Sequence, residues 1–98
     1  MWRHGDVFLA QTSKIPRGAK ARPHCILAEG ELTGHCHRIQ ESDAAVLYDF
    51  KGERFLEVTA ERATLVHQEH AAIELPKGTY RVWIQREYSP EEIRRVVD

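Results

Sequence analysis

Several features are scarce or missing in this sequence of 98 residues. It has two cysteines, Cys25 and Cys36, too few for the disulfide framework of a small secreted protein. No apolar run is long enough to cross a bilayer, and the N-terminus lacks the apolar core of a signal peptide, so we expect a cytoplasmic protein with no membrane partner. The formal net charge of −1 argues against a protein that holds nucleic acid through bulk positive charge.

Common catalytic motifs are also missing. The glycines follow neither the spacing of a phosphate-binding loop nor that of a dinucleotide fingerprint. No serine-nucleophile motif is present in the sequence. Cys36 stands between two histidines, but alternation along a strand would turn its thiol away from them, which disfavours a cysteine protease.

The composition is that of a folded globular domain, with 42% hydrophobic and 30% charged residues. We expect one domain over residues 1–98, because no linker, repeat or low-complexity tract divides the chain. A chain of this size buries only about two thirds of the surface that its unfolded state exposes. A bound metal or assembly into a homo-oligomer would therefore add stability.

Hydrophobic alternation predicts an all-β fold. Apolar residues recur with period two more often than with the longer period of a helix. We expect about seven short strands, over residues 6–11, 24–28, 35–40, 45–50, 54–58, 63–67 and 79–88. Short strands with frequent turns are typical of a small barrel or sandwich.

Three segments carry signals for turns or helix ends. The glycine within residues 51–53 favours a hairpin between two of the predicted strands. Residues 76–78, Pro-Lys-Gly, predict a tight turn into the last strand. Ser89 as a cap, Pro90 at the first helical position and Glu92 behind it predict one short C-terminal helix.

Four of the six histidines form two groups, and these indicate a metal site. His35 and His37 lie two residues apart on a predicted strand, so their imidazoles share one face. His67 and His70 follow where another strand is expected to end. If the two segments pair, the four imidazoles converge as ligands for a divalent transition metal such as Zn²⁺, Mn²⁺, Fe²⁺ or Ni²⁺.

Carboxylates next to these histidines extend the predicted site. Glu69, and alternatively Glu41, would serve as a further ligand, as a support for a ligand, or as a general base. His4 and His24 lie outside both groups, and we expect no role for either in the site.

The last predicted strand interleaves aromatic and basic residues. Arg81 on this strand, with Arg86, would hold a phosphate group if the histidines acted as acid and base without a metal. Trp83 beside them would stack on a base, so nucleic acid stays open as a partner. The alternative is a core strand with one polar face.

Part of this pattern resembles the cupins, whose first motif places a His-x-His pair shortly before a glutamate. His35, His37 and Glu41 match that spacing. Pro76 matches the Pro-x-Gly turn of the second cupin motif, but Arg81 stands where the cupin histidine would follow. The resemblance implies a β-barrel metal site in which His67 or His70 supplies the remaining ligand.

Nearly the full length of the chain is similar to a group of small uncharacterised bacterial and phage-borne proteins. The shared features are a Gly-His-x-His segment at residues 34–37, a His-x-Glu-His segment at residues 67–70, and the segments 5–7, 27–31, 73–76, 78–82 and 85–88. This resemblance implies no established function.

Three hypotheses follow. The first is a metal-binding β domain, with or without catalysis, that leaves a coordination position for water or a small-molecule substrate. The second is a metal-free nuclease-like enzyme acting on a phosphate-containing substrate through histidine acid and base. The third is a non-enzymatic phage or prophage module in which histidines meet at a subunit interface.

Overall fold

The computed structural model describes residues 1–29 and 34–84. These residues form eight strands: β1 (Trp2–His4), β2 (Val7–Gln11), β3 (Lys20–Ala21), β4 (Ile26–Glu29), β5 (Cys36–Ile39), β6 (Ala45–Phe50), β7 (Glu53–Val66) and β8 (Ile73–Ile84). No helix occurs among them, which confirms the all-β prediction. The helix predicted to begin near Pro90 lies outside the described residues. The described part of the chain contains no helix with the length and apolarity that a membrane crossing needs.

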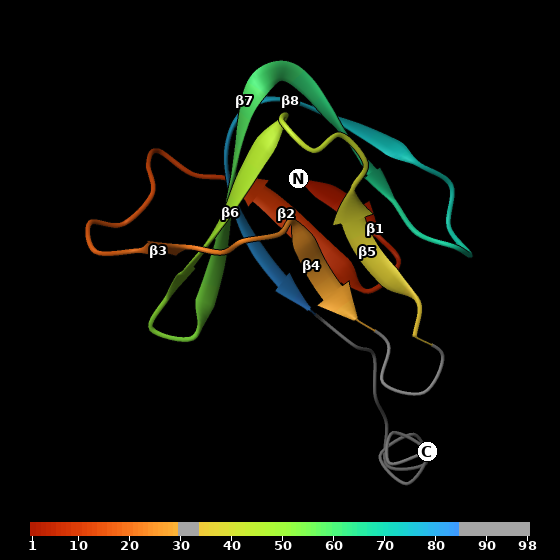
Figure 1. The fold of residues 1–98 in the computed structure, drawn as a ribbon, viewed down its shortest axis with the longest axis horizontal. Helices are drawn as coiled ribbons and strands as arrows, with labels where there is room; N and C mark the ends of the chain where they lie inside the picture. The colour runs from red at the N-terminus through yellow and green to blue at the C-terminus, as the bar shows by residue number, and fades with distance from the viewer. Residues whose placement is uncertain (30–33, 85–98) are drawn as a thin grey trace, which may run out of the picture.

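All strand pairings are antiparallel and belong to one sheet (Figure 1). The main path runs β1-β2-β8-β7-β5-β4, and β6 joins it by pairing with β7 on one side and β3 on the other. Among the described strands, β1 and β4 stand at the two ends of this path. The described pairings therefore leave the sheet open instead of closing it into a barrel.

The strands β7 and β8 form one long, bent hairpin, seen at the top of Figure 1. The segments 54–58 and 63–67, predicted as two strands, belong to the continuous β7. The predicted turn at 76–78 is wrong, because Pro76 pairs with Arg62 and Gly78 with Val58 inside β8. A register shift on β7 between Val58 and Arg62 accommodates the bend. The proline and glycine therefore mark a bend in a strand, where a bulge tolerates them.

The predicted hairpin between β6 and β7 is present. Phe50 pairs with Glu53, so only Lys51 and Gly52 connect the strands. Both loop residues have positive φ, 50° and 82°. This is the backbone of a type I′ turn, whose twist matches that of the two strands.

Inward-facing apolar side chains from most strands form a single core. The largest fully buried side chains are Tyr80, Leu9, Leu27, Leu47, Leu56, Leu65, Leu75, Val7 and Val58. Trp2 of the short strand β1 packs edge-on against Tyr80 at 5.3 Å between ring centroids, which fixes β1 over the core. Among the described residues, only His4 and His37 are buried and polar, with 3% and 6% of their surface exposed. These two histidines mark the candidate functional site.

A candidate metal centre

The site forms where the edge strand β1 meets β5 and the loop between β7 and β8. His4 ends β1, His37 lies within β5, and His67 and His70 follow β7. The strands β1 and β5 are not paired through their backbones, yet the curved sheet brings them side by side (Figure 1). A hydrogen bond between the two buried imidazoles spans this junction at 2.8 Å.

Two hydrogen bonds hold the loop that carries His67 and His70. The backbone N–H of Cys36 donates to Gln68 Oε1 at 3.0 Å, which ties the loop to β5. His4 Nε2 donates to the carbonyl oxygen of Ala71 at 2.9 Å, which ties it to β1. The histidines of the loop are thus held beside His37 by contacts with two separate strands.

These contacts determine which nitrogen of His37 bears a lone pair. The Ala71 carbonyl can only accept, so the proton of neutral His4 sits on Nε2. His4 Nδ1 must then accept the hydrogen bond from His37 Nδ1. The second nitrogen of His37, Nε2, is left with its lone pair available as a metal ligand. His4 orients His37 as the outer partners of metal-bound histidines do.

Three imidazoles converge on one position. One ring nitrogen from each of His37, His67 and His70 lies within 4.8 Å of those of the other two. The His37 and His67 ring centroids are 4.3 Å apart, and those of His67 and His70 are 4.6 Å apart. A tetrahedral zinc ion needs ligand nitrogens about 3.4 Å apart, so a small closure of the group would complete the site. His37 is buried, whereas half-buried His67 and exposed His70 are the members that can shift.

His67 must exchange a hydrogen bond to act as a ligand. Its Nδ1 accepts the backbone N–H of Glu69 at 2.9 Å. Neutral His67 therefore carries its proton on Nε2. Coordination of a metal ion through either nitrogen would displace that bond or move that proton.

Gly5 makes room for the imidazoles. A Cβ atom at this position would lie 2.7 Å from His70 Nε2 and 3.1 Å from His37 Cε1. The residue also has a φ of +64°, which disfavours side chains. The turn between β1 and β2 is thus closely fitted to the rings of His37 and His70.

The electrostatics keep the central histidines neutral. Burial, together with the neighbouring His67 and His4, lowers the pKa of His37 from an ordinary 6.5 to about 4. Burial also lowers the pKa values of His4 and His67, and the nearby His70 adds to both shifts. Neutral imidazole is the form that binds a metal, so these three residues need not lose a proton near pH 7.

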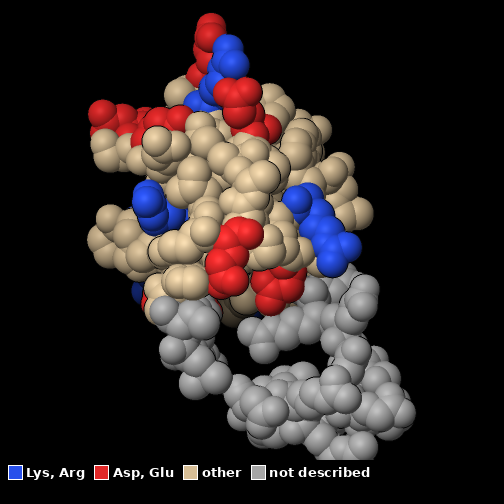
Figure 2. Space-filling model, turned by 90° about the vertical axis from the view of Figure 1, so that its right-hand side faces the viewer, with Lys and Arg blue, Asp and Glu red and all other residues tan. Residues whose placement is uncertain are grey.

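Carboxylates border the cluster. Asp6 Oδ1 lies 3.7 Å from His37 Nε2. His35 Nδ1 donates to Glu69 Oε2 at 2.6 Å beside the ring of His67. Figure 2 views the molecule from the right-hand side of Figure 1, where the loop between β7 and β8 lies. Acidic side chains are visible near the middle of this face. This environment favours a cation over an anion.

The histidines named from the sequence are distributed unequally. His37, His67 and His70 share the three-histidine group, whereas His35 precedes β5 and its ring centroid lies 5.7 Å from that of His67. The expectation that His4 stands apart is wrong, because β1 carries it against His37. No local signal marks His4, since its neighbours come from β5 and from the loop after β7. His24 has no place in the group; its Nδ1 accepts the backbone N–H of Ile26.

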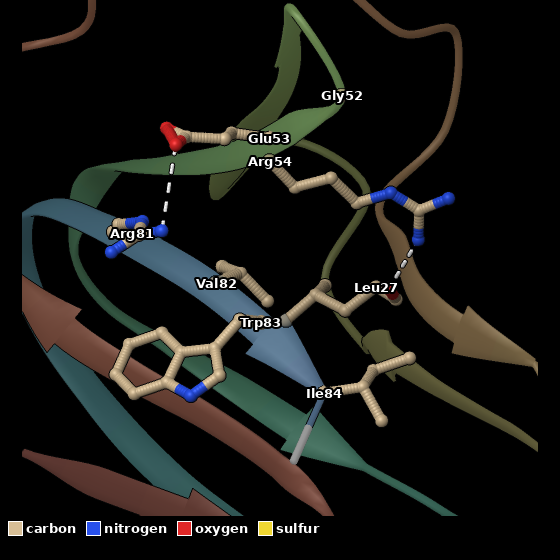
Figure 3. A pocket seen from close by; sticks show the side chains of 8 residues that line it. All are labelled: Leu27, Gly52, Glu53, Arg54, Arg81, Val82, Trp83 and Ile84. Carbon is tan, nitrogen blue, oxygen red and sulfur yellow. Dashed lines mark hydrogen bonds and ion pairs between the residues drawn. The ribbon is translucent and has the colours of Figure 1, made fainter.

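Two other predicted site residues lie elsewhere. Arg81 lines a cavity of about 360 Å³ to which no histidine contributes, and it donates to Glu53 Oε1 at 3.4 Å (Figure 3). Glu41 accepts hydrogen bonds from the backbone N–H and the hydroxyl of Thr64 at 2.8 and 2.7 Å. These bonds lower the pKa of Glu41 and commit its carboxylate to Thr64. The described site therefore does not combine Glu41 with the histidines as the cupin spacing implied.

Fold and site together define a small all-β domain with a histidine group of metal-binding spacing at a sheet junction. Residues 3–85 match the family described as "Domain of unknown function (DUF8820)". The match covers most of the chain, which belongs to this family. Comparison with curated proteins and with solved structures found no match.

Proposed function

We propose that this domain binds a divalent transition metal ion through His37, His67 and His70. The observation that carries the proposal is the convergence of three ring nitrogens within 4.8 Å, one of them on the buried His37. The bond from His37 Nδ1 to His4 supports it, because it leaves the lone pair of His37 Nε2 available to a metal ion. Imidazole nitrogen suits Zn²⁺, Fe²⁺ and Ni²⁺, and the nearby carboxylates extend the choice to Mn²⁺.

Three imidazoles leave one tetrahedral position open, as in catalytic zinc sites. Asp6 Oδ1, 3.7 Å from His37 Nε2, is close enough to fill that position or to accept a hydrogen bond from a water molecule there. The ligand set thus suits a metal-dependent enzyme that activates water or polarises a small-molecule substrate. We place it in the cytoplasm, in keeping with the free thiols of Cys25 and Cys36.

Equilibrium binding of Zn²⁺ to the full chain, purified without a histidine tag, tests the proposal. We expect saturable binding that His37→Gln reduces at least tenfold, since loss of one ligand exceeds the effect of losing an outer partner. His24→Gln is the matched control, because His24 is a histidine outside the group, and it should bind as the natural chain does. Equal binding by the natural chain and the His37 variant would refute the proposal.

A metal-free acid/base enzyme is the second candidate. The 2.6 Å bond between His35 and Glu69 favours it, because a carboxylate in this position orients an imidazole for proton transfer. Arg81, one of the two arginines expected to hold phosphate in this enzyme, lines a separate cavity, and the other, Arg86, lies outside the described residues. Hydrolysis of a phosphodiester that persists in excess chelator would support the second candidate over the first.

A further inference from the structure

The cluster holds more donor groups than one ion uses. His4 is engaged in orienting His37, and the group of three imidazoles with Asp6 would complete a tetrahedral site. His35 and Glu69 form a second pair of donors beside this group, with the ring centroid of His35 5.7 Å from that of His67.

The geometry of this pair suits a cation. His35 Nδ1 and Glu69 Oε2 are 2.6 Å apart and joined by a hydrogen bond. A tetrahedral metal ion needs its ligand atoms about 3.4 Å apart, so the two atoms would have to separate by about 0.8 Å to hold a cation between them. The side chains of His35 and Glu69 are 33% and 63% exposed, which leaves room for water to complete the coordination shell.

The ring of His67 lies near those of both His37 and His35. Its ring centroid is 4.3 Å from that of His37 and 5.7 Å from that of His35. The backbone N–H of Glu69 donates to His67 Nδ1, which fixes the carboxylate's residue next to this ring. Glu69 beside His35 and Asp6 beside His37 would supply negative charge to offset repulsion between two cations.

We propose that His35 and Glu69 form a second, weaker metal position beside the three-histidine site, making this a two-metal centre. The inference rests on the proposed function, because the first ion would occupy the three-histidine group. The second position has the lower metal affinity, because the chain offers it two donors instead of three and both are partly exposed to solvent.

Zn²⁺ titration of the full chain, followed by calorimetry and by native mass spectrometry, tests this inference. We expect two equivalents, the second about tenfold weaker or more because it has fewer protein ligands. His35→Gln and, separately, Glu69→Gln should lose the second equivalent and keep the first. His24→Gln, the matched control, should keep both, and circular dichroism should show each variant folded.

The other outcomes separate this inference from the proposed function. A single equivalent that His35→Gln leaves unchanged would overturn the second position and keep the first. Two equivalents that persist in both the His35 and Glu69 variants would place the second ion elsewhere and also overturn it. Loss of both zinc equivalents in either folded variant would show that all the ligands belong to one shared site, and it would overturn the separate second position. Absence of any bound zinc would overturn both proposals.

Discussion

Replacing His4 tests the link between the buried histidine pair and the metal site. His4 is not one of the three proposed metal ligands. It connects His37 Nδ1 to the carbonyl oxygen of Ala71 through hydrogen bonds of 2.8 and 2.9 Å. His4→Leu removes both bonds, whereas His4→Gln supplies a carboxamide whose oxygen can accept from His37 and whose N–H can donate to Ala71.

The expected magnitudes follow from the burial of the pair. With leucine at position 4, the N–H at His37 Nδ1 lies buried without an acceptor, which costs about 1–3 kcal/mol of folding stability. His37 also loses the partner that selects its tautomer, so zinc affinity should fall about 10- to 100-fold. His4→Gln should lose less than about tenfold, because it restores both hydrogen bonds.

Three measurements follow the two variants. Chemical denaturation gives the stability, calorimetry gives the zinc affinity, and the ring-nitrogen NMR shifts report which nitrogen of His37 carries the proton. In the natural chain without metal, that proton should be on Nδ1. If His4→Leu binds zinc as tightly as the natural chain, or if the proton of His37 sits on Nε2, the orienting role is refuted.

Three further predictions concern stability. Because folding lowers the pKa of His37 from 6.5 to about 4, the unfolded state binds more protons between these values. Metal-free protein should therefore be at full stability above pH 6.5 and lose about 3 kcal/mol on acidification to pH 4, whereas His37→Gln should show a smaller loss by denaturant titration. Gly5→Ala should destabilise the chain by about 1–2 kcal/mol and weaken zinc binding, because its Cβ would meet His70 and its φ is +64°. The control Gly52→Ala, also at positive φ but with nothing within 4 Å, should cost stability and leave zinc affinity unchanged. Chelator should lower the melting temperature of zinc-loaded protein at neutral pH and leave that of zinc-treated His37→Gln nearly unchanged.

The sequence predicts local structure well and long-range structure less well. The hairpin at Lys51 and Gly52 could be predicted because two adjacent residues determine its turn. The continuity of β7 could not, because Pro76 on the partner strand signals a turn and only the register shift opposite it reveals a bend. Strand β1 is three residues long, too short for alternation to be recognised.

In the candidate site, too, residues marked by a local sequence signal could be predicted, whereas those placed by long-range contacts could not. His37, His67 and His70 were found from their spacing, which is a local signal. His4 was missed because its role depends on curvature that brings the first strand against β5, over a separation of 33 residues. His35 was placed on one face with His37 by assuming a strand from residue 35, but β5 begins at Cys36, so alternation does not govern the direction of His35.

X-ray absorption at the zinc edge, on full chain loaded with one equivalent of Zn²⁺, tests the central claim most directly. Scattering from imidazole rings is distinctive, and the account predicts three of them with nitrogens about 2.0–2.1 Å from the metal. His37→Gln at the same loading should show fewer imidazoles, and His24→Gln should match the natural chain. A zinc environment with no more than one imidazole, or one unchanged by His37→Gln, would contradict a metal centre built on His37, His67 and His70.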